Sequence, residues 1–125
     1  GEHEEGSTWE AVASAAKYEL DNLTFVLDRN HMQISGKTDD IGNLGDIAVR
    51  YRALGWEVFE VDGHSIAKLL KTFALATKKN KKPKLVIAKT VMGKGVLFIE
   101  NDYHYHGRVP NEEEYERAIK VLSYE

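Results

Sequence analysis

Apolar residues at helical spacing mark the first helix of the chain. Ser7-x-x-Glu10 fits a capping box, and the apolar positions behind it predict a helix over 8–20. A second helix is expected over 44–54. It should end at Gly55, because glycine adopts the left-handed conformation that often follows a helix.

Two further helices are expected in the C-terminal half. Ser65 is expected to begin a helix, and the lysine-rich stretch 78–84 should end it and stay solvated. Asn111-x-x-Glu114 is a second capping box, followed by an acidic first turn, and it predicts a terminal helix.

Short apolar runs between these helices predict strands. The run 23–27 shows no alternation, as in a strand buried on both faces, and 56–61 and 85–88 are the next strands. Single helices separate the strands, which favours an α/β fold with a parallel sheet and flanking helices. The polar segments 28–38 and 91–110 follow strands and are expected to be irregular. Ligands bind beyond the carboxyl ends of parallel strands, so these segments are the first candidates for a site.

Composition narrows the function classes. The 125 residues suffice for one domain, with 42% hydrophobic and 30% charged residues. The net charge of −3 gives no reason to expect nucleic acid or a membrane surface as a partner. The chain has no cysteine, so disulfide and thiolate chemistry are excluded. The first residues contain no Met and no signal-peptide pattern, and they suggest the middle of a longer sequence.

Asn30 is the first residue with candidate metal chemistry. It directly follows the first predicted strand, and its amide oxygen is a donor that Mg²⁺ accepts. Asparagine after a strand is also a common turn residue, so this observation leaves both roles open.

The spacing from Gly1 to Asn30 adds context. Twenty-eight residues separate the two, and a helix and a strand are predicted between them. This arrangement resembles the fingerprint of thiamine-diphosphate enzymes, Gly-Asp-Gly followed by Asn at a comparable distance. Gly1 would be the second glycine of that fingerprint, so the acidic metal ligand would precede it.

The rest of the chain resembles the transketolase family in particular. The matching segments, in the expected order, are Glu5-Gly6-x-x-Trp9-Glu10-Ala11, Leu20-Asp21-Asn22-Leu23, Asp28-x-Asn30-x-x-Gln33-Ile34-x-Gly36-Lys37-Thr38, Tyr51-Arg52-Ala53-Leu54-Gly55-Trp56, Val61-Asp62-Gly63-His64, Lys89-Thr90-x-x-Gly93-Lys94-Gly95-Val96 and His106-Gly107.

The resemblance implies that residues 1–125 are the C-terminal part of a diphosphate-binding domain. It implies thiamine diphosphate with Mg²⁺ or Ca²⁺, and transfer of a two-carbon ketol unit between sugar phosphates in the cytoplasmic pentose phosphate pathway. A pyrimidine-binding domain would lie on another chain segment or subunit of a homodimer or heterotetramer, so this chain alone would be catalytically incomplete. Two alternatives stay open: a related enzyme such as dihydroxyacetone synthase, and a non-catalytic scaffold subunit.

The resemblance also assigns site residues. Gly1 would give its amide to the diphosphate, and Asn30 would bind the metal ion and touch the diphosphate. Met32 would bind the metal through its backbone carbonyl, and Ile34 would pack near the thiazolium ring. His106 would be the catalytic residue, contacting both the cofactor and the sugar substrate. An imidazole there can donate to phosphate or assist proton transfer.

Other ionisable residues receive simpler interpretations. Glu5 and Glu10 would lie toward a dimer interface by the same resemblance. His3, His31 and His104 are expected to be solvated or to anchor loops.

Overall fold

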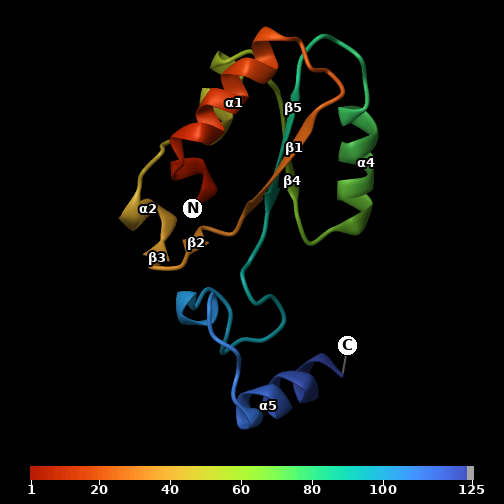
Figure 1. The fold of residues 1–125 in the computed structure, drawn as a ribbon. Helices are drawn as coiled ribbons and strands as arrows, with labels where there is room; N and C mark the ends of the chain where they lie inside the picture. Colours follow the sequence, from red (N-terminus) through yellow and green to blue (C-terminus); the bar gives the residue numbers. More distant parts are fainter. Residues whose placement is uncertain (124–125) are drawn as a thin grey trace. The chain divides into compact units, whose positions relative to one another are not determined.

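The computed structural model describes residues 1–123, which form two compact units. Unit 1 contains Gly1–Arg29 and Leu44–Thr90, and unit 2 contains Asn30–Asn43 and the chain from Val91 onward. The predicted α/β fold, a parallel sheet with flanking helices, is confirmed in unit 1 (Figure 1). No helix of residues 1–123 is long and apolar enough to cross a membrane.

The sheet of unit 1 has the order β1-β5-β4, and both neighbouring pairs are parallel. Its strands are β1 (Thr24–Arg29), β4 (Glu57–Asp62) and β5 (Lys84–Lys89). Strand β5 comes last in the chain but lies at the centre, so residues 85–88 are buried by both of its neighbours and by both layers of helices.

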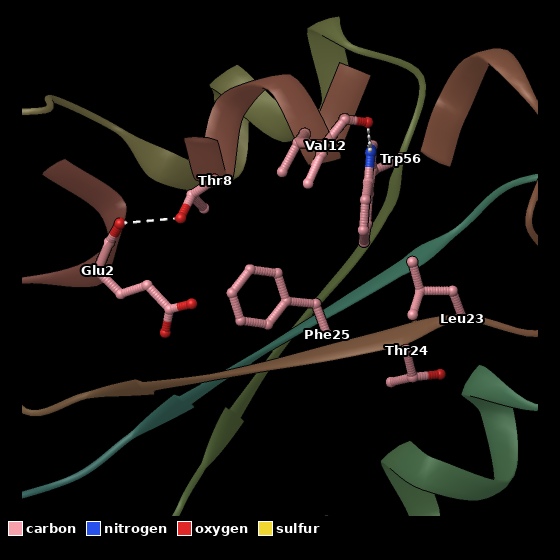
Figure 2. Close-up of a pocket in the computed structure, with 8 residues that line it drawn as sticks. Glu2, Thr8, Val12, Leu23, Thr24, Phe25 and Trp56 are labelled. Atoms are coloured by element: carbon pink, nitrogen blue, oxygen red, sulfur yellow. Dashed lines mark hydrogen bonds between the residues drawn. The ribbon is translucent and has the colours of Figure 1, made fainter. Parts of the chain in front are cut away.

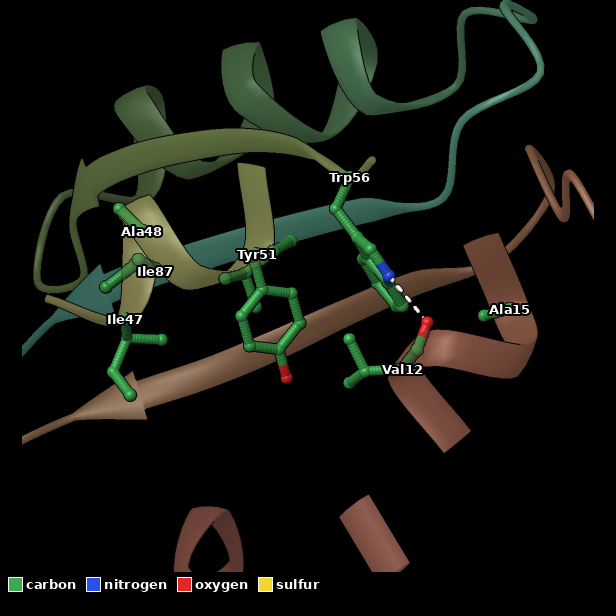
Figure 3. Packing of buried hydrophobic residues seen from close by; sticks show 8 residues of the cluster. Val12, Ala15, Ile47, Ala48, Tyr51, Trp56 and Ile87 are labelled. Atoms are coloured by element: carbon green, nitrogen blue, oxygen red, sulfur yellow. Dashed lines mark hydrogen bonds between the residues drawn. The ribbon is translucent and has the colours of Figure 1, made fainter. Parts of the chain in front are cut away.

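One face of the sheet carries most of the core. The helices α1 (Gly6–Lys17) and α3 (Ile47–Ala53) pack on this face, where Tyr51 is completely buried (Figure 3). The indole of Trp56 meets the Tyr51 ring edge-on, with 5.1 Å between the ring centres. Its Nε1 donates to the carbonyl of Val12 at 2.9 Å. This bond ties the start of β4 to α1.

The opposite face is covered by α4 (Ile66–Ala76), where Ala76 packs with Val61 and Val86. The predicted start of this helix is confirmed, because the Ser65 side chain accepts a hydrogen bond from the amide of Lys68.

The predicted end of α3 is also confirmed. Gly55 follows the C-cap Leu54 with φ +90°, a conformation that favours glycine. The helix is shorter than the predicted range 44–54, since it begins only after Asp46, whose side chain accepts from the amide of Val49 at 3.0 Å.

Unit 2 contains short elements. They are β2 (Met32–Gln33), β3 (Gly36–Lys37), α2 (Thr38–Ile41), the 3₁₀ helix η2 (Tyr103–Tyr105) and α5 (Glu112–Leu122). The capping box that opens α5 is confirmed. The expectation that 28–38 is irregular was wrong, because β2 and β3 pair as a small antiparallel hairpin. Two-residue strands carry too few residues to show a hydrophobic period.

The first capping box was predicted wrongly. Helix α1 begins at Gly6 with Glu5 at its N-cap, and Glu5 makes no side-chain cap. A 3₁₀ helix, η1 (Glu2–Glu4), precedes it, and the Glu5 carbonyl already accepts from the amide of Thr8. Ser7 therefore lies inside the first turn. The helix also ends at Lys17 rather than at residue 20.

Two predictions of burial were also wrong. Strand β1 alternates between exposed and half-buried residues, and Val26 is 45% exposed, because β1 lies at an edge of the described sheet. Lys84 belongs to no solvated helix end: it begins β5 and is completely buried. Its Nζ donates to Asn80 Oδ1 at 2.7 Å and to the Lys82 carbonyl at 2.6 Å, which satisfies the buried ammonium group.

Candidate functional site

Asn30 directly follows the carboxyl end of β1, as predicted. Its Oδ1 accepts a hydrogen bond from the amide of Met32 at 2.9 Å, which folds the side chain over the following turn. His31 lies between them with φ +62°, and its carbonyl accepts from the amide of Thr38 at 3.0 Å. The structure thus brings the two predicted metal ligands, Asn30 and Met32, together in one tight turn.

This turn offers oxygen donors that fit Mg²⁺. A carbonyl-type oxygen has two lone pairs, so Asn30 Oδ1 can accept from Met32 and still bind a cation. The remaining ligands of an octahedral ion would come from water, from a diphosphate or from an acidic residue. Residues 1–123 contain no cluster of three or more His, Cys, Asp or Glu side chains able to hold a metal ion. The oxygen donors of this turn are of the kind that a Mg²⁺ ion accepts beside water and phosphate ligands.

Ile34 lies at the tip of the hairpin between β2 and β3. Its side chain is 73% exposed. An apolar side chain that a tight hairpin exposes to solvent is available to pack against the ring of a bound ligand. The structure is compatible with the role predicted for Ile34.

The hairpin meets the long loop 91–110 within unit 2. A cavity of about 440 Å³ is lined by Met32 and Lys37 from the hairpin, by Asp40 from α2, and by Asp102 and Tyr103 from the loop. The Asn30 turn and the segment leading to His106 therefore share one hollow. Both segments follow strands of a parallel sheet, and on that ground the sequence made them the first candidates for a site.

His106 lies at the end of η2 with an exposed side chain. Its backbone amide donates to the carbonyl of Tyr103 at 2.9 Å. On either side of it, Tyr105 and Arg108 both donate to the carboxylate of Glu114, at the start of α5. His106 is thus presented to solvent from a firmly anchored backbone. The sequence indicated Glu114 only as a helix cap and gave no signal of these further bonds.

Gly1 belongs to unit 1, where it caps η1. Its carbonyl accepts from the amide of Glu4 at 2.9 Å. The neighbouring turn is fixed by Thr8 Oγ1, which donates to the Glu2 carbonyl at 3.0 Å, and by Trp9 Nε1, which donates to the His3 carbonyl at 2.7 Å. The backbone at Gly1 is therefore held in a defined conformation while its own surface stays exposed.

Of the two roles expected for His3, solvation is wrong, and anchoring of the chain segment around it is what the structure has. It is 8% exposed, its Nε2 lies 2.9 Å from Tyr51 Oη, and its ring stacks on Phe25 at 5.3 Å. Burial lowers the pKa of His3 below its ordinary value. No local pattern distinguishes such a histidine from a solvated one, since its partner Tyr51 is 48 residues away in sequence.

Glu5 and Glu10 have exposed side chains on α1 or at its start. Such a position is compatible with the interface predicted for them. His104 anchors its own loop, with Nδ1 2.6 Å from Asp102 Oδ1.

A separate hollow in unit 1 is mostly apolar. It measures about 240 Å³ and is lined by Thr8 and Val12 of α1, by Phe25 of β1 and by Trp56, with Glu2 at its rim (Figure 2). None of the predicted site residues lines it.

Comparison with known proteins gives the family. Parallel α/β sheets bind ligands beyond the carboxyl ends of their strands, and here the Asn30 turn directly follows β1. The family model described as "Transketolase, thiamine diphosphate binding domain" matches residues 1–125. The chain belongs to this transketolase family.

Individual relatives agree with this assignment. The chain is 41% identical over 123 residues to an apulose-4-phosphate transketolase subunit from Phocaeicola vulgatus, covering 98% of this chain and 44% of that protein. It is 34% identical over 125 residues to a 6-deoxy-6-sulfo-D-fructose transketolase subunit from a Clostridium species, covering 100% of this chain and 46% of that protein. The chain thus spans less than half the length of these curated relatives.

A solved structure confirms the fold. The crystal structure of transketolase from Campylobacter jejuni superposes with a TM-score of 0.90 at 32% identity, covering 98% of this chain and 19% of that one.

Proposed function

We propose that this chain is the C-terminal part of the diphosphate-binding domain of a transketolase. The complete protein would transfer a two-carbon ketol unit from a ketose phosphate to an aldose phosphate, with thiamine diphosphate and a divalent cation. The observation that carries the proposal is the turn after β1, where Asn30 and Met32 lie together in a chain of the thiamine-diphosphate-binding family.

Each predicted site residue has a defined role in this proposal. The thiamine cofactor supplies the electron sink for carbanion chemistry when it is bound. Asn30 Oδ1 and the Met32 carbonyl hold the cation, and the Gly1 amide donates to a diphosphate oxygen. Ile34 packs near the thiazolium ring of the cofactor and excludes water from it. His106 donates a hydrogen bond to phosphate and exchanges a proton with a sugar hydroxyl.

The activity is proposed for the complete protein, because the curated relatives are more than twice as long as this chain. Several of them are named as subunits of transketolases. We therefore propose that a second chain segment or subunit supplies the pyrimidine-binding part. Sugar phosphates are the proposed substrates, and the cytoplasm is the proposed location.

Asn30→Ala tests the cofactor site in the complete protein. Loss of the amide oxygen removes a cation ligand, so thiamine diphosphate with Mg²⁺ should bind at least about tenfold more weakly, a change of about 1.4 kcal/mol. Asn22→Ala is the matched control, because Asn22 is exposed and precedes the opposite end of β1. Calorimetric titration measures both affinities. Unchanged affinity in Asn30→Ala would remove Asn30 from the site.

Activity assays separate the related functions. Turnover of a ketose phosphate with ribose 5-phosphate as acceptor supports a transketolase. Preference for formaldehyde as acceptor would instead indicate a dihydroxyacetone synthase. A complete protein that binds the cofactor and turns over neither acceptor would be the non-catalytic subunit.

A further inference from the structure

The carboxylate of Glu114 is the centre of a hydrogen-bond network. Its Oε1 accepts from Tyr105 Oη at 2.8 Å and from Arg108 Nη2 at 2.6 Å. Its Oε2 accepts from Arg108 Nη1 at 2.8 Å and from the amide of Asn111 at 2.9 Å. Four donors on one carboxylate satisfy nearly all of its acceptor positions, and the two bonds from Arg108 form a planar fork.

Two of these partners lie on either side of His106. Tyr105 precedes it, and Arg108 follows it after Gly107. The guanidinium of Arg108 also lies 4.1 Å from the centre of the Tyr105 ring, so the two side chains contact each other as well as Glu114. The backbone of the His106–Gly107 turn is thus fixed at both ends by one acidic residue.

Glu114 is itself held in place. It is the third residue of α5, and its amide donates to Asn111 Oδ1 at 2.9 Å in the capping box. Arg108, and next the Asn111 amide, lower the pKa of Glu114 to about 2. The carboxylate is therefore ionised at neutral pH, where the fork to Arg108 is complete.

The imidazole of His106 has no comparable support. Its side chain is exposed and makes no hydrogen bond with any residue that the structure describes. Where this ring points therefore depends on the backbone between residues 105 and 108. Small displacements of a reacting group lower turnover strongly, because proton transfer requires close alignment.

We infer that Glu114 is a positioning residue, which holds Tyr105 and Arg108 so that His106 faces the sugar substrate. This inference rests on the proposed function, since it assigns a purpose to the geometry around His106. It extends that function to a residue whose partners are side chains and backbone of this chain.

Glu114→Gln in the complete protein tests the inference. Glutamine also serves in a capping box, so α5 should keep its start, while the ionic fork to Arg108 is lost. The turnover number should fall on the order of tenfold, and the affinity for thiamine diphosphate should change less than about twofold. Glu113→Gln is the matched control: it removes a neighbouring acidic charge from the same first turn, where the side chain is exposed.

A double variant separates positioning from general loss of stability. Arg108→Met should lower turnover as Glu114→Gln does. Combining both should cost little more than either alone, because the two residues act through one contact. The imidazole signal of His106 in NMR should shift in both single variants and not in Glu113→Gln.

The outcomes distinguish this inference from the proposed function. His106→Ala should lower turnover about 10²-fold or more. Near-normal turnover in that variant would remove His106 from the mechanism and overturn the positioning role of Glu114, whereas the proposed transketolase activity would stand. If His106→Ala is inactive but Glu114→Gln retains full turnover, only the positioning role is wrong. Equal losses in Glu113→Gln and Glu114→Gln would also overturn it.

Discussion

At the scale of single residues, the hydrogen bond between His3 and Tyr51 links η1 to α3. The two rings lie 5.7 Å apart, and both side chains are buried in unit 1. Tyr51 also keeps its proton, because burial raises the pKa of its hydroxyl. The pair is thus a neutral, buried contact. It lies close in sequence to Gly1, whose backbone amide binds the diphosphate in the proposed function.

This contact predicts a loss of stability in mild acid. Burial, as the largest cause, lowers the pKa of His3 below 6.5, with Arg29 acting in the same direction and Glu2 opposing them. Unfolded His3 therefore takes up a proton first as the pH falls below 6.5. The free energy of unfolding should decline from there until the lower folded-state pKa is reached.

Urea unfolding at a series of pH values measures this effect in the complete protein. His3→Leu should be less stable at pH 7, because Tyr51 loses its partner, and should lack this part of the pH dependence. Asn22→Ala, an exposed position in unit 1 that does not titrate, is the control and should keep the wild-type slope. A wild-type slope in His3→Leu would contradict the assignment.

At the scale of elements, the loop 91–110 depends on glycine at some positions and not at others. Gly93 has φ +71°, and a Cβ there would lie 2.6 Å from Ile99 Cγ2 and 3.0 Å from the Ile99 backbone. A Cβ on Gly107 would meet nothing within 4 Å. Gly93 is therefore required by both conformation and space.

Gly93→Ala should destabilise the protein by about 1–3 kcal/mol, the scale of a strained left-handed residue. Gly107→Ala should change stability by less than about 0.5 kcal/mol, as an uncrowded surface substitution. Chemical denaturation measures the pair. Equal stability of the two variants would show that the loop adapts around Ile99.

Elements fixed by local chemistry were the ones the sequence predicted. Ser65, Gly55 and the Asn111–Glu114 box act within four residues of themselves, and each appears where expected. The prediction that Ser7 caps the first helix was wrong, because η1 precedes this helix and moves its start toward the N-terminus. The sequence does not reveal η1, since it has no apolar period. The burial of Lys84 depends on acceptors in two loops, which no single segment encodes.

At the scale of the whole molecule, the strand order could not be predicted. The apolar run that became β1 and the run that became β5 look alike in sequence, yet only β5 has a neighbour on each side. The candidate site was more predictable, because Asn30, Met32 and His106 follow strands or belong to motifs that resemble one family. The hydrogen bonds from Tyr105 and Arg108 to Glu114 could not be predicted, because Glu114 was already explained as part of a capping box.

Assembly is the remaining property proposed at this scale. Glu5 precedes α1 and Glu10 lies on it, and both side chains are exposed. The family resemblance places an interface between subunits there. The complete protein should sediment as a dimer or a larger assembly. Glu5→Arg should weaken association at least about tenfold, because it introduces a longer side chain of opposite charge. Glu116→Arg, an exposed position on α5, should leave association unchanged. A complete protein that is fully active as a monomer would contradict this proposal.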